Sequence, residues 1–398
     1  MTVSKGAERH AEASPIFASD RLDTLDVLRG FAVLAIFIVN VKMMANGFNH
    51  YRDASLWNGE VAQLITFLHS RFVHGKFVTI FTALFGAGLA LLLARSRPVP
   101  LYIVVRRLFW LGVFGTLHLV FLREGDILVW YAMAGVVALP FTWLSSRTLF
   151  LAGFVFQALA FSIYNFVPSP EVDIPTLWQT TPDAHRDVAV IMLGSLGDQV
   201  AARAETMPYY LFYLFILEGV WIDTLSVMLL GMALLKTGFL SGRKTPKQYL
   251  FIGVLSLCVA FGRDVLIPHL DSEDGFQALM ISAIGQAHYL AAALTWSCAI
   301  IGAVVMGWPA RRFAAVGRTA FTIYILESAI GLLLFSSLGL GLFGQLSLEV
   351  LMAITAAVWI VFLVAAPLWL SRYQYGPLEW LWRSLTYGRR QPWRRATE

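Results

Sequence analysis

The sequence predicts an all-α protein, a polytopic bundle of about ten transmembrane helices with both termini on the cytoplasmic side. Of the 398 residues, 58% are hydrophobic and 14% are charged, against about 45–50% and about 25% in soluble domains. The mean hydropathy is +0.67, and a soluble chain of this length must cover its surface with polar groups. The solvent that suits this composition is a lipid bilayer.

Apolar runs long enough to cross a membrane define the predicted spans. A hydrocarbon layer of about 30 Å needs about 20 apolar residues in a helix. The 26 residues before the first run are too many and too acidic to begin a secretory signal, so we expect this run to remain as an anchor. The ten runs cover residues 27 to 45, 77 to 94, 101 to 122, 127 to 144, 148 to 167, 209 to 235, 248 to 268, 278 to 308, 316 to 338 and 348 to 371.

The positions of the charged residues support this count, because Lys and Arg collect in the cytoplasmic loops of membrane proteins. With the N-terminus inside, 21 of the 30 Lys and Arg fall in cytoplasmic segments and six fall in outer loops, whereas 13 of the 25 acids lie outside. We therefore expect a cytoplasmic segment 1–26, a transmembrane domain 27–371 and a basic cytoplasmic tail 372–398. The tail is expected to contact anionic lipid, and nucleic acid is not an expected partner.

Two segments between the predicted spans have distinct characters. Residues 60 to 76 are apolar only in part, which favours an interfacial or re-entrant helix that leads into the second span. Residues 168 to 208 form one long outer loop that is too short for an ordinary domain. We expect this loop to be a lid or a partly helical cap.

Polar residues inside the spans are the candidate functional residues, since no soluble catalytic domain, zinc signature or phosphate-binding loop is evident. A charge within the bilayer is costly unless it is paired or faces water. Asp26 and Arg29 are three residues apart and can pair on one helix face, and Asn40 returns to that face about three turns later. The pair either anchors the helix at the interface or belongs to a site.

A second candidate site lies where the third span turns into the fourth. His118 precedes this turn and Asp126 follows it, so a helical hairpin would bring imidazole and carboxylate together near the outer surface. Such a carboxylate orients the ring and favours its protonated form, as general-base catalysis requires, although the same contact could simply cap the hairpin. Gly125 is expected to serve the turn, and Glu124 to face water.

Further ionisable groups lie deeper in the sequence. Glu218 and Asp223 are five residues apart in the sixth span and cannot both face one site squarely. His288 and Glu327 have no partner nearby in the sequence. Together these groups suggest a polar cavity that opens outward. The small residues of FGAGLA, 85 to 90, are expected to allow close helix packing.

Five blocks of the sequence resemble the characteristic blocks of the YeiB family, also called domain of unknown function 418. The resemblance implies a bacterial polytopic inner-membrane protein, sometimes described as transport-associated. Glu327 stands where this family often has Gln, which makes the position titratable. The blocks are RLDTLDVLRGFAVLAIFIVN, GKFVTIFTALFGAG, HLVFLREGDILVWYAMAG, GRTAFTIYILES and GPLEWLWRSLT.

A more distant similarity is to transmembrane acyltransferases such as heparan-alpha-glucosaminide N-acetyltransferase, which moves an acetyl group from cytosolic acyl-CoA to an acceptor across the membrane. The shared pattern is an opening LRG, Asn40 and a stretch that reads DASLWNG here, residues 53 to 59. Where the acetyltransferase has a catalytic His immediately before Ala-Ser, this chain has Asp53. His50, three residues upstream, is the alternative candidate.

The first hypothesis from these residues is acyl transfer from acyl-CoA to a small molecule or an envelope glycan. His118 or His50 would be the base, Asp126 would orient it, and Asn40 would donate to the developing oxyanion. No permanently bound cofactor and no metal are expected, and the oligomeric state stays open. The residues expected near the CoA phosphates are Arg106, Arg107 or Arg318.

The second hypothesis is a small-molecule transporter or an export helper in which carboxylates handle protons. A structural or signalling role in the membrane is the third. The residues that would line a transport pathway are Asp26, Arg29, Asn40, His118, Asp126, Glu218 and Glu327.

Overall fold

The computed structural model describes residues 23–48, 57, 59–94, 99–168, 173–179, 181–217 and 219–395, and every regular element of more than one residue in them is helical. The predicted all-α class is confirmed. The α-helices are α1 (Asp23–Asn46), α2 (Glu60–Leu68), α3 (Lys76–Leu93), α4 (Leu101–Phe121), α5 (Leu128–Ala138), α6 (Ser146–Phe166), α7 (Pro182–Leu193), α8 (Leu196–Pro208), α9 (Val220–Lys236), α10 (Pro246–Leu266), α11 (Gly275–Val305), α12 (Arg311–Arg318), α13 (Ala320–Phe335), α14 (Leu348–Arg372) and α15 (Pro377–Tyr387).

Five short elements of other helical types connect or extend these helices. They are the π-helices η4 (His69–Val73) and η7 (Tyr209–Leu217), and the 3₁₀-helices η5 (Leu139–Trp143), η6 (Thr176–Trp178) and η8 (Ile267–His269). α2 continues through η4 and, after a turn at His74 and Gly75, into α3, so Glu60–Leu93 forms one candidate span of 34 residues. The segment predicted as an outer cap contains η6, α7 and α8 and is therefore partly helical.

The helices of the described segments fall into three groups when they are compared with the ten predicted spans. Seven are long and apolar enough to cross a membrane: α1, Glu60–Leu93, α4, α6, Pro246–His269, α11 and α14. Two further spans result if each bent pair is counted, with bends of 59° between Leu196–Ile216 and α9 and of 79° between α12 and α13. The remaining predicted span, 127 to 144, corresponds to the shorter apolar helix Leu128–Trp143.

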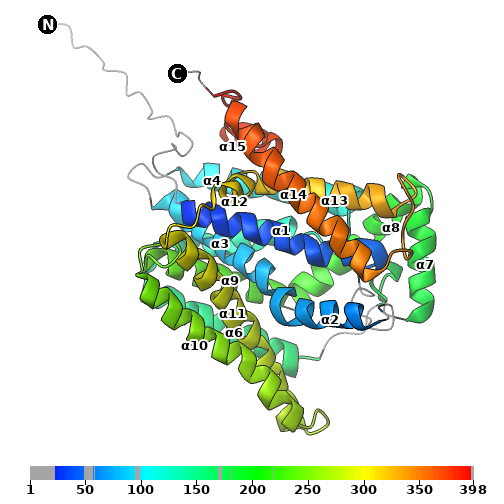
Figure 1. The fold of residues 1–398 in the computed structure, drawn as a ribbon, viewed down its shortest axis with the longest axis horizontal. Helices are drawn as coiled ribbons and strands as arrows, with labels where there is room; N and C mark the ends of the chain where they lie inside the picture. The colour runs from blue at the N-terminus through cyan, green and yellow to red at the C-terminus, as the bar shows by residue number, and fades with distance from the viewer. Residues whose placement is uncertain are drawn as a thin grey trace, which may run out of the picture.

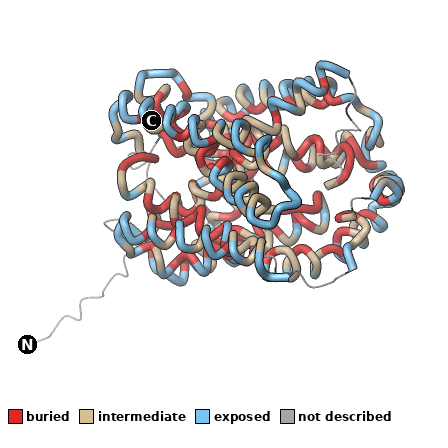
Figure 2. The backbone as a smooth tube through the Cα atoms, turned by 90° about the horizontal axis from the view of Figure 1, so that it is seen from below, coloured by how far each residue is buried: buried red, intermediate tan, exposed pale blue. Residues whose placement is uncertain are grey.

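α1 is the central helix of the bundle (Figure 1). It packs against α3, α11, α12, α13 and α14, and Leu28, Val33 and Phe37 on it are fully buried. By contrast, α6 and α10 lie at the edge and expose large apolar side chains such as Phe154 and Phe251. Figure 2 shows the same separation of buried inner and exposed outer positions. Apolar outer faces of this kind suit contact with lipid.

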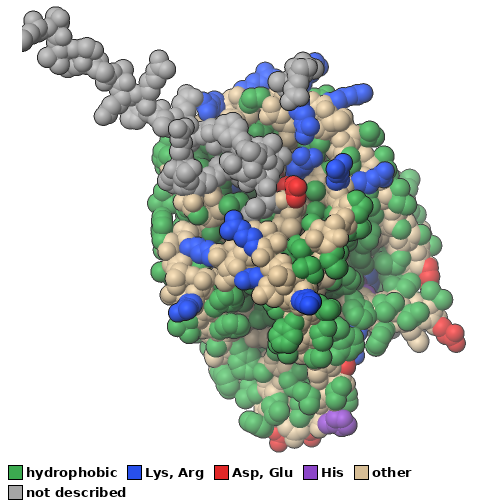
Figure 3. All heavy atoms as spheres, turned by 60° about the vertical axis from the view of Figure 1, so that its left-hand side comes forward, with side chains coloured by type: hydrophobic (Ala, Val, Ile, Leu, Met, Phe, Trp, Pro, Cys, Tyr) green, Lys and Arg blue, Asp and Glu red, His purple; other side chains and the backbone are tan. Residues whose placement is uncertain are grey.

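The two ends of the bundle differ in charge. The end where α1 begins and α15 lies is the predicted cytoplasmic end, and α7 and α8 lie at the opposite, predicted outer end (Figure 1). Figure 3 turns the left-hand end of Figure 1 toward the viewer, and Lys and Arg side chains are spread over the upper and middle parts of the face shown, whereas the few acidic side chains lie mostly at its right-hand and lower edges. This distribution agrees with the topology that the positive-inside rule predicts.

Glycines allow two pairs of helices to touch along their backbones. A Cβ atom built on Gly86 of α3 would lie 2.2 Å from the carbonyl oxygen of Met228 on α9, and one on Gly231 would lie 2.0 Å from that of Ala83. On α1, a Cβ at Gly30 would lie 2.0 Å from the carbonyl oxygen of Phe313. The predicted close packing at FGAGLA is therefore present at Gly86.

We expect Gly86→Ala to destabilise the protein by about 1–3 kcal/mol, because the added methyl group must push α3 and α9 apart. Gly88→Ala is the matched control, since a Cβ at Gly88 meets open space and Ala favours a helix over Gly by about 1 kcal/mol. Thermal unfolding of both variants in the same detergent measures the difference. Equal melting temperatures would contradict the proposed α3–α9 contact.

Candidate functional site

His118 forms the centre of a buried chain of polar contacts. Its Nδ1 lies 2.8 Å from Asp126 Oδ1, and its Nε2 forms a hydrogen bond of 2.8 Å with Ser328 Oγ on α13. His118 is 2% exposed, and Asp126 and Ser328 are fully buried. The contact that the hairpin predicted is therefore present. Ser328 was not among the predicted site residues.

The turn between α4 and α5 places Asp126 at this position. Gly125 adopts φ +80°, a conformation that Gly takes at little cost. Asp126 Oδ2 then accepts a hydrogen bond of 2.8 Å from the N–H of Val129, which satisfies one of the free donors at the start of α5. Gly115 lets the turn approach α4, because a Cβ there would lie 2.7 Å from Asp126 Oδ2. Asp126 therefore both caps a helix and faces His118.

Two tyrosines hold Asp126 from the other side. Tyr324 OH donates to Asp126 Oδ1 at 3.3 Å, and Tyr210 OH donates to the main-chain oxygen of Asp126. The N–H direction at His118 Nδ1 is not aligned with Asp126 Oδ1, so the two side chains are in close polar contact without a linear hydrogen bond. Catalytic hydrogen bonds are often poorly aligned before a ligand is bound.

Arg123, which the sequence analysis did not select, links Asn40 to this chain. Its guanidinium donates to Asn40 Oδ1 at 3.0 Å, to the Gly125 carbonyl oxygen at 3.1 Å and to Tyr324 OH at 3.3 Å. Asn40 Nδ2 is buried and has no hydrogen-bond partner in the part of the chain that the structure describes. It remains available as the donor that was predicted for Asn40. The sequence feature that could have identified Arg123 as a site residue is its position as a basic residue in a short turn between two apolar spans.

The expectation that Glu124 faces water is wrong. Glu124 is buried, and its Oε2 lies 3.6 Å from Nε of Arg203 on α8. The cap helices cover the hairpin, so a residue that would otherwise reach solvent meets a cation instead. A cavity of about 20 Å³ beside Arg123, Glu124 and Arg203 has room for about one water molecule.

Glu327 adds a third carboxyl group to the buried polar residues around Arg123. Its side chain is fully buried within electrostatic reach of Arg123, and neither oxygen has a hydrogen-bond partner among the described residues. Two arginines, Arg123 and Arg203, thus face three carboxyl groups, those of Glu124, Asp126 and Glu327. Buried charge without a partner is costly, and Glu327 is the carboxyl group of this cluster that accepts no hydrogen bond among the described residues.

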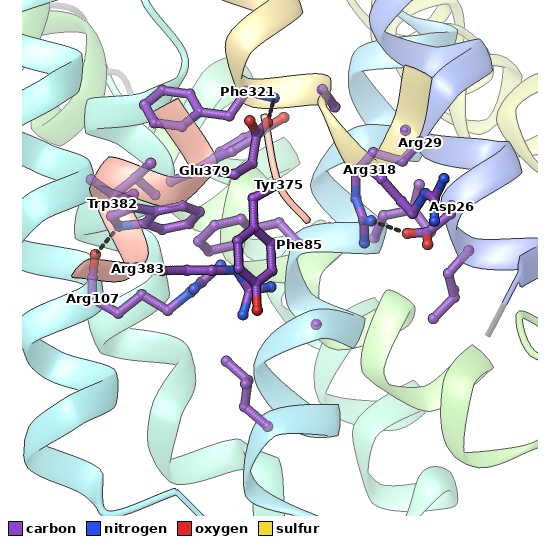
Figure 4. Close-up of a pocket in the computed structure, with 18 of the residues that line it drawn as sticks. Asp26, Arg29, Phe85, Arg107, Arg318, Phe321, Tyr375, Glu379, Trp382 and Arg383 are labelled. Atoms are coloured by element: carbon purple, nitrogen blue, oxygen red, sulfur yellow. Dashed lines mark hydrogen bonds and ion pairs between the residues drawn. The ribbon is translucent and has the colours of Figure 1, made fainter. Parts of the chain in front are cut away.

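A cavity of about 250 Å³ lies at the predicted cytoplasmic end (Figure 4). Arg29 and Arg318 line one side of it, and Arg107 and Arg383 lie on the other. Its walls also carry aromatic rings, and its lining includes Tyr131 and Tyr324. We call this cavity the arginine pocket. It is lined by α1, α3, α4, α5, α12, α13 and α15 and by the segment before α15.

The acids of the arginine pocket already have partners. Arg29 lies 2.6 Å from Asp26, as their spacing predicted. Glu379 Oε1 accepts from the main-chain N–H groups of Phe321 at 2.8 Å and Thr322 at 3.1 Å, so it caps the N-terminus of α13. Burial raises the pKa of Glu379, and these hydrogen bonds oppose that rise. The net charge offered to a ligand is therefore positive.

Arg107 is the clearest ligand-facing cation of the pocket. Its Cζ lies 3.6 Å from the centre of the Trp382 ring, and Arg29 and Arg383 are close enough to repel it. No salt bridge joins Arg107 to a carboxylate within the described ranges. Several guanidinium groups around one cavity favour the binding of an anion.

The other predicted site residues lie apart from this arrangement. Arg106 does not line the pocket, and its Nε donates to the main-chain oxygen of Thr386. His50 and Glu218 lie outside the described residues. Asp223 accepts a hydrogen bond from Gln157 Nε2 at 2.8 Å, and His288 Nδ1 contacts the Ala260 oxygen at 2.9 Å. Among the residues described, no group of three or more His, Cys, Asp or Glu side chains is placed to hold a metal ion.

Comparison with known proteins places the chain in a family. A family model described as protein of unknown function (DUF418) matches residues 234–389. The uncharacterized protein YxaH of Bacillus subtilis (strain 168) is 31% identical over 96% of this chain and 98% of its own length. The uncharacterized protein YeiB of Escherichia coli (strain K12) is 29% identical over 92% and 96%. This chain belongs to the DUF418 family.

Proposed function

We propose that this protein transfers an acyl group from cytosolic acyl-CoA to a hydroxyl or amino acceptor at the outer face of the bacterial inner membrane. One observation carries the proposal. Tyr324 lines the arginine pocket, and its hydroxyl also donates to Asp126, which belongs to the buried series of polar contacts around His118. A single side chain therefore joins an anion-binding cavity at one end of the bundle to a buried acid–base group.

The arginine pocket suits the chemistry of a CoA thioester. Guanidinium groups bind phosphates with paired hydrogen bonds, and Arg107 and Arg383 lie against the rings of Trp382 and Tyr375, which hold these two guanidinium groups at the pocket. At about 250 Å³ the cavity is smaller than the roughly 300–1,000 Å³ of a complete ligand site. It would hold the pantetheine arm and the thioester, while the nucleotide lies at the mouth.

The buried chain supplies the groups that acyl transfer needs. His118 takes the proton of the attacking nucleophile, and Asp126 orients the ring and stabilises the imidazolium that forms. Asn40 Nδ2 is the donor for the oxyanion of the tetrahedral intermediate. The Arg123 guanidinium donates to Asn40 Oδ1, so the amide nitrogen of Asn40 can donate to the oxyanion.

A second candidate function is proton-coupled transport of a small anion, and Glu327 favours it. A fully buried carboxyl group without a hydrogen-bond partner in the described segments is the kind of group that carries protons in transporters. Transport moves its substrate without covalent change, whereas acyl transfer releases free CoA. The appearance of the CoA thiol therefore separates the two functions.

Acetyl-CoA is expected to stabilise the purified protein in nanodiscs, because a ligand that binds the folded state alone raises its stability by mass action. At about 100 times the dissociation constant, the gain is about 2.7 kcal/mol. Thermal unfolding measured with acetyl-CoA, free CoA and ATP tests this, and thiol release is followed in the same samples. The proposal fails if acetyl-CoA at millimolar concentration causes no shift in folded protein.

A further inference from the structure

We propose that Ser328 is a covalent nucleophile, which accepts the acyl group from the thioester and holds it as a serine ester before the final acceptor arrives. This inference rests on the proposed acyl transfer and adds its chemical intermediate. Asp126, His118 and Ser328 stand in the order of a Ser-His-Asp triad, with the carboxylate at Nδ1 and the hydroxyl at Nε2. Both distances are 2.8 Å.

The contacts of the imidazole determine the direction of proton transfer. A carboxylate at Nδ1 favours the tautomer that carries its proton there, so Nε2 presents a lone pair to Ser328. The Ser328 hydroxyl has a second acceptor, the Tyr324 carbonyl oxygen, at the longer distance of 3.3 Å. A hydroxyl in contact with a base that is itself oriented by a third group is the arrangement of an activated nucleophile.

The arginine pocket approaches this hydroxyl through Tyr324, although Ser328 itself does not line the pocket. Tyr324 lines the pocket, and Ser328 follows it by one turn on the same face of α13, about 6 Å further along the helix axis. Ser328 is fully buried. The thioester carbon can reach its Oγ once the Tyr324 side chain leaves its contacts with Asp126 and Arg123.

The reaction then proceeds in two balanced halves. In the first, Ser328 Oγ bonds to the carbonyl carbon, the carbon–sulfur bond breaks, and the Oγ proton passes through His118 Nε2 to the CoA thiolate. In the second, the acceptor oxygen or nitrogen bonds to the same carbon, the ester bond to Oγ breaks, and His118 returns the acceptor's proton to Ser328. Donor and acceptor can therefore use the site in turn, from opposite ends of the bundle.

The test uses the full-length protein in nanodiscs with radiolabelled acetyl-CoA and no added acceptor. We expect a rapid release of about one CoA per protein, the yield of the first half-reaction alone, together with one acid-stable acetyl group located at Ser328 by mass spectrometry. Ser328→Ala should lose both signals but still bind acetyl-CoA. Ser328→Cys should form a thioester that neutral hydroxylamine cleaves.

Ser297→Ala is the matched control, because Ser297 is a buried helical serine that donates to the carbonyl oxygen four residues earlier but has no imidazole partner among the described residues. It should retain the acetyl adduct. If wild type and Ser328→Ala release CoA equally, Ser328 is not the nucleophile and the proposed acyl transfer stands. Binding without label or CoA release also overturns the role of Ser328. If neither protein binds acetyl-CoA, both proposals fail.

Discussion

His118→Gln is expected to lower the rate of CoA release from acetyl-CoA by about 100- to 10,000-fold, the usual contribution of a general base. Glutamine keeps a polar side chain of similar size between Asp126 and Ser328, so the buried carboxylate keeps a polar neighbour and we expect the fold to be preserved. What the variant loses is the group that takes up a proton. The measurement is thiol release in nanodiscs, with acetyl-CoA binding determined in parallel and expected to be unchanged.

His288→Gln is the control for this experiment. His288 is also buried in a long apolar helix, but its Nδ1 contacts the Ala260 carbonyl oxygen and it lies in neither the His118 chain nor the arginine pocket. Its substitution should leave the rate of CoA release within about twofold of wild type, because it alters local packing around α11 and leaves the proposed reacting groups in place. A His118→Gln protein with wild-type turnover would remove His118 from the mechanism.

Arg107→Gln is expected to weaken acetyl-CoA binding by about 10- to 100-fold, since a hydrogen bond to a charged group contributes about 1.5–3 kcal/mol. Arg106→Gln is the matched control, because the neighbouring guanidinium contacts the main chain of α15 and does not line the pocket. Titration calorimetry at low and moderate salt measures both. Equal losses would mean that net charge at this end of the bundle, and not the pocket, attracts the ligand.

Local contacts of the site could be predicted from the sequence. Asp26 and Arg29 pair because residues three apart share a helix face, and His118 meets Asp126 because a short turn joins their helices. In both cases the geometry of a helix or a hairpin fixes the distance. The positions of the long apolar helices were predictable for a similar reason, since the thickness of the bilayer sets their length.

Contacts between helices that are distant in sequence could not be predicted in this way. Ser328 is 210 residues from His118, and Arg123 is 83 residues from Asn40. Such contacts depend on which faces of separate helices pack together, and close crossings at glycines such as Gly86 decide this. Glu124 was misplaced for the same reason, because its environment depends on Arg203 in the cap.

The contribution of α15 has a consequence for how the protein is made. Glu379 supplies the cap of α13, and Trp382 and Arg383 supply part of the pocket wall. A ribosome translates these residues after all the long apolar helices, and folding of a nascent chain proceeds from its N-terminus. The arginine pocket is therefore incomplete until α15 has been made, and a message that ends before codon 377 would produce a protein that lacks this part of the pocket wall.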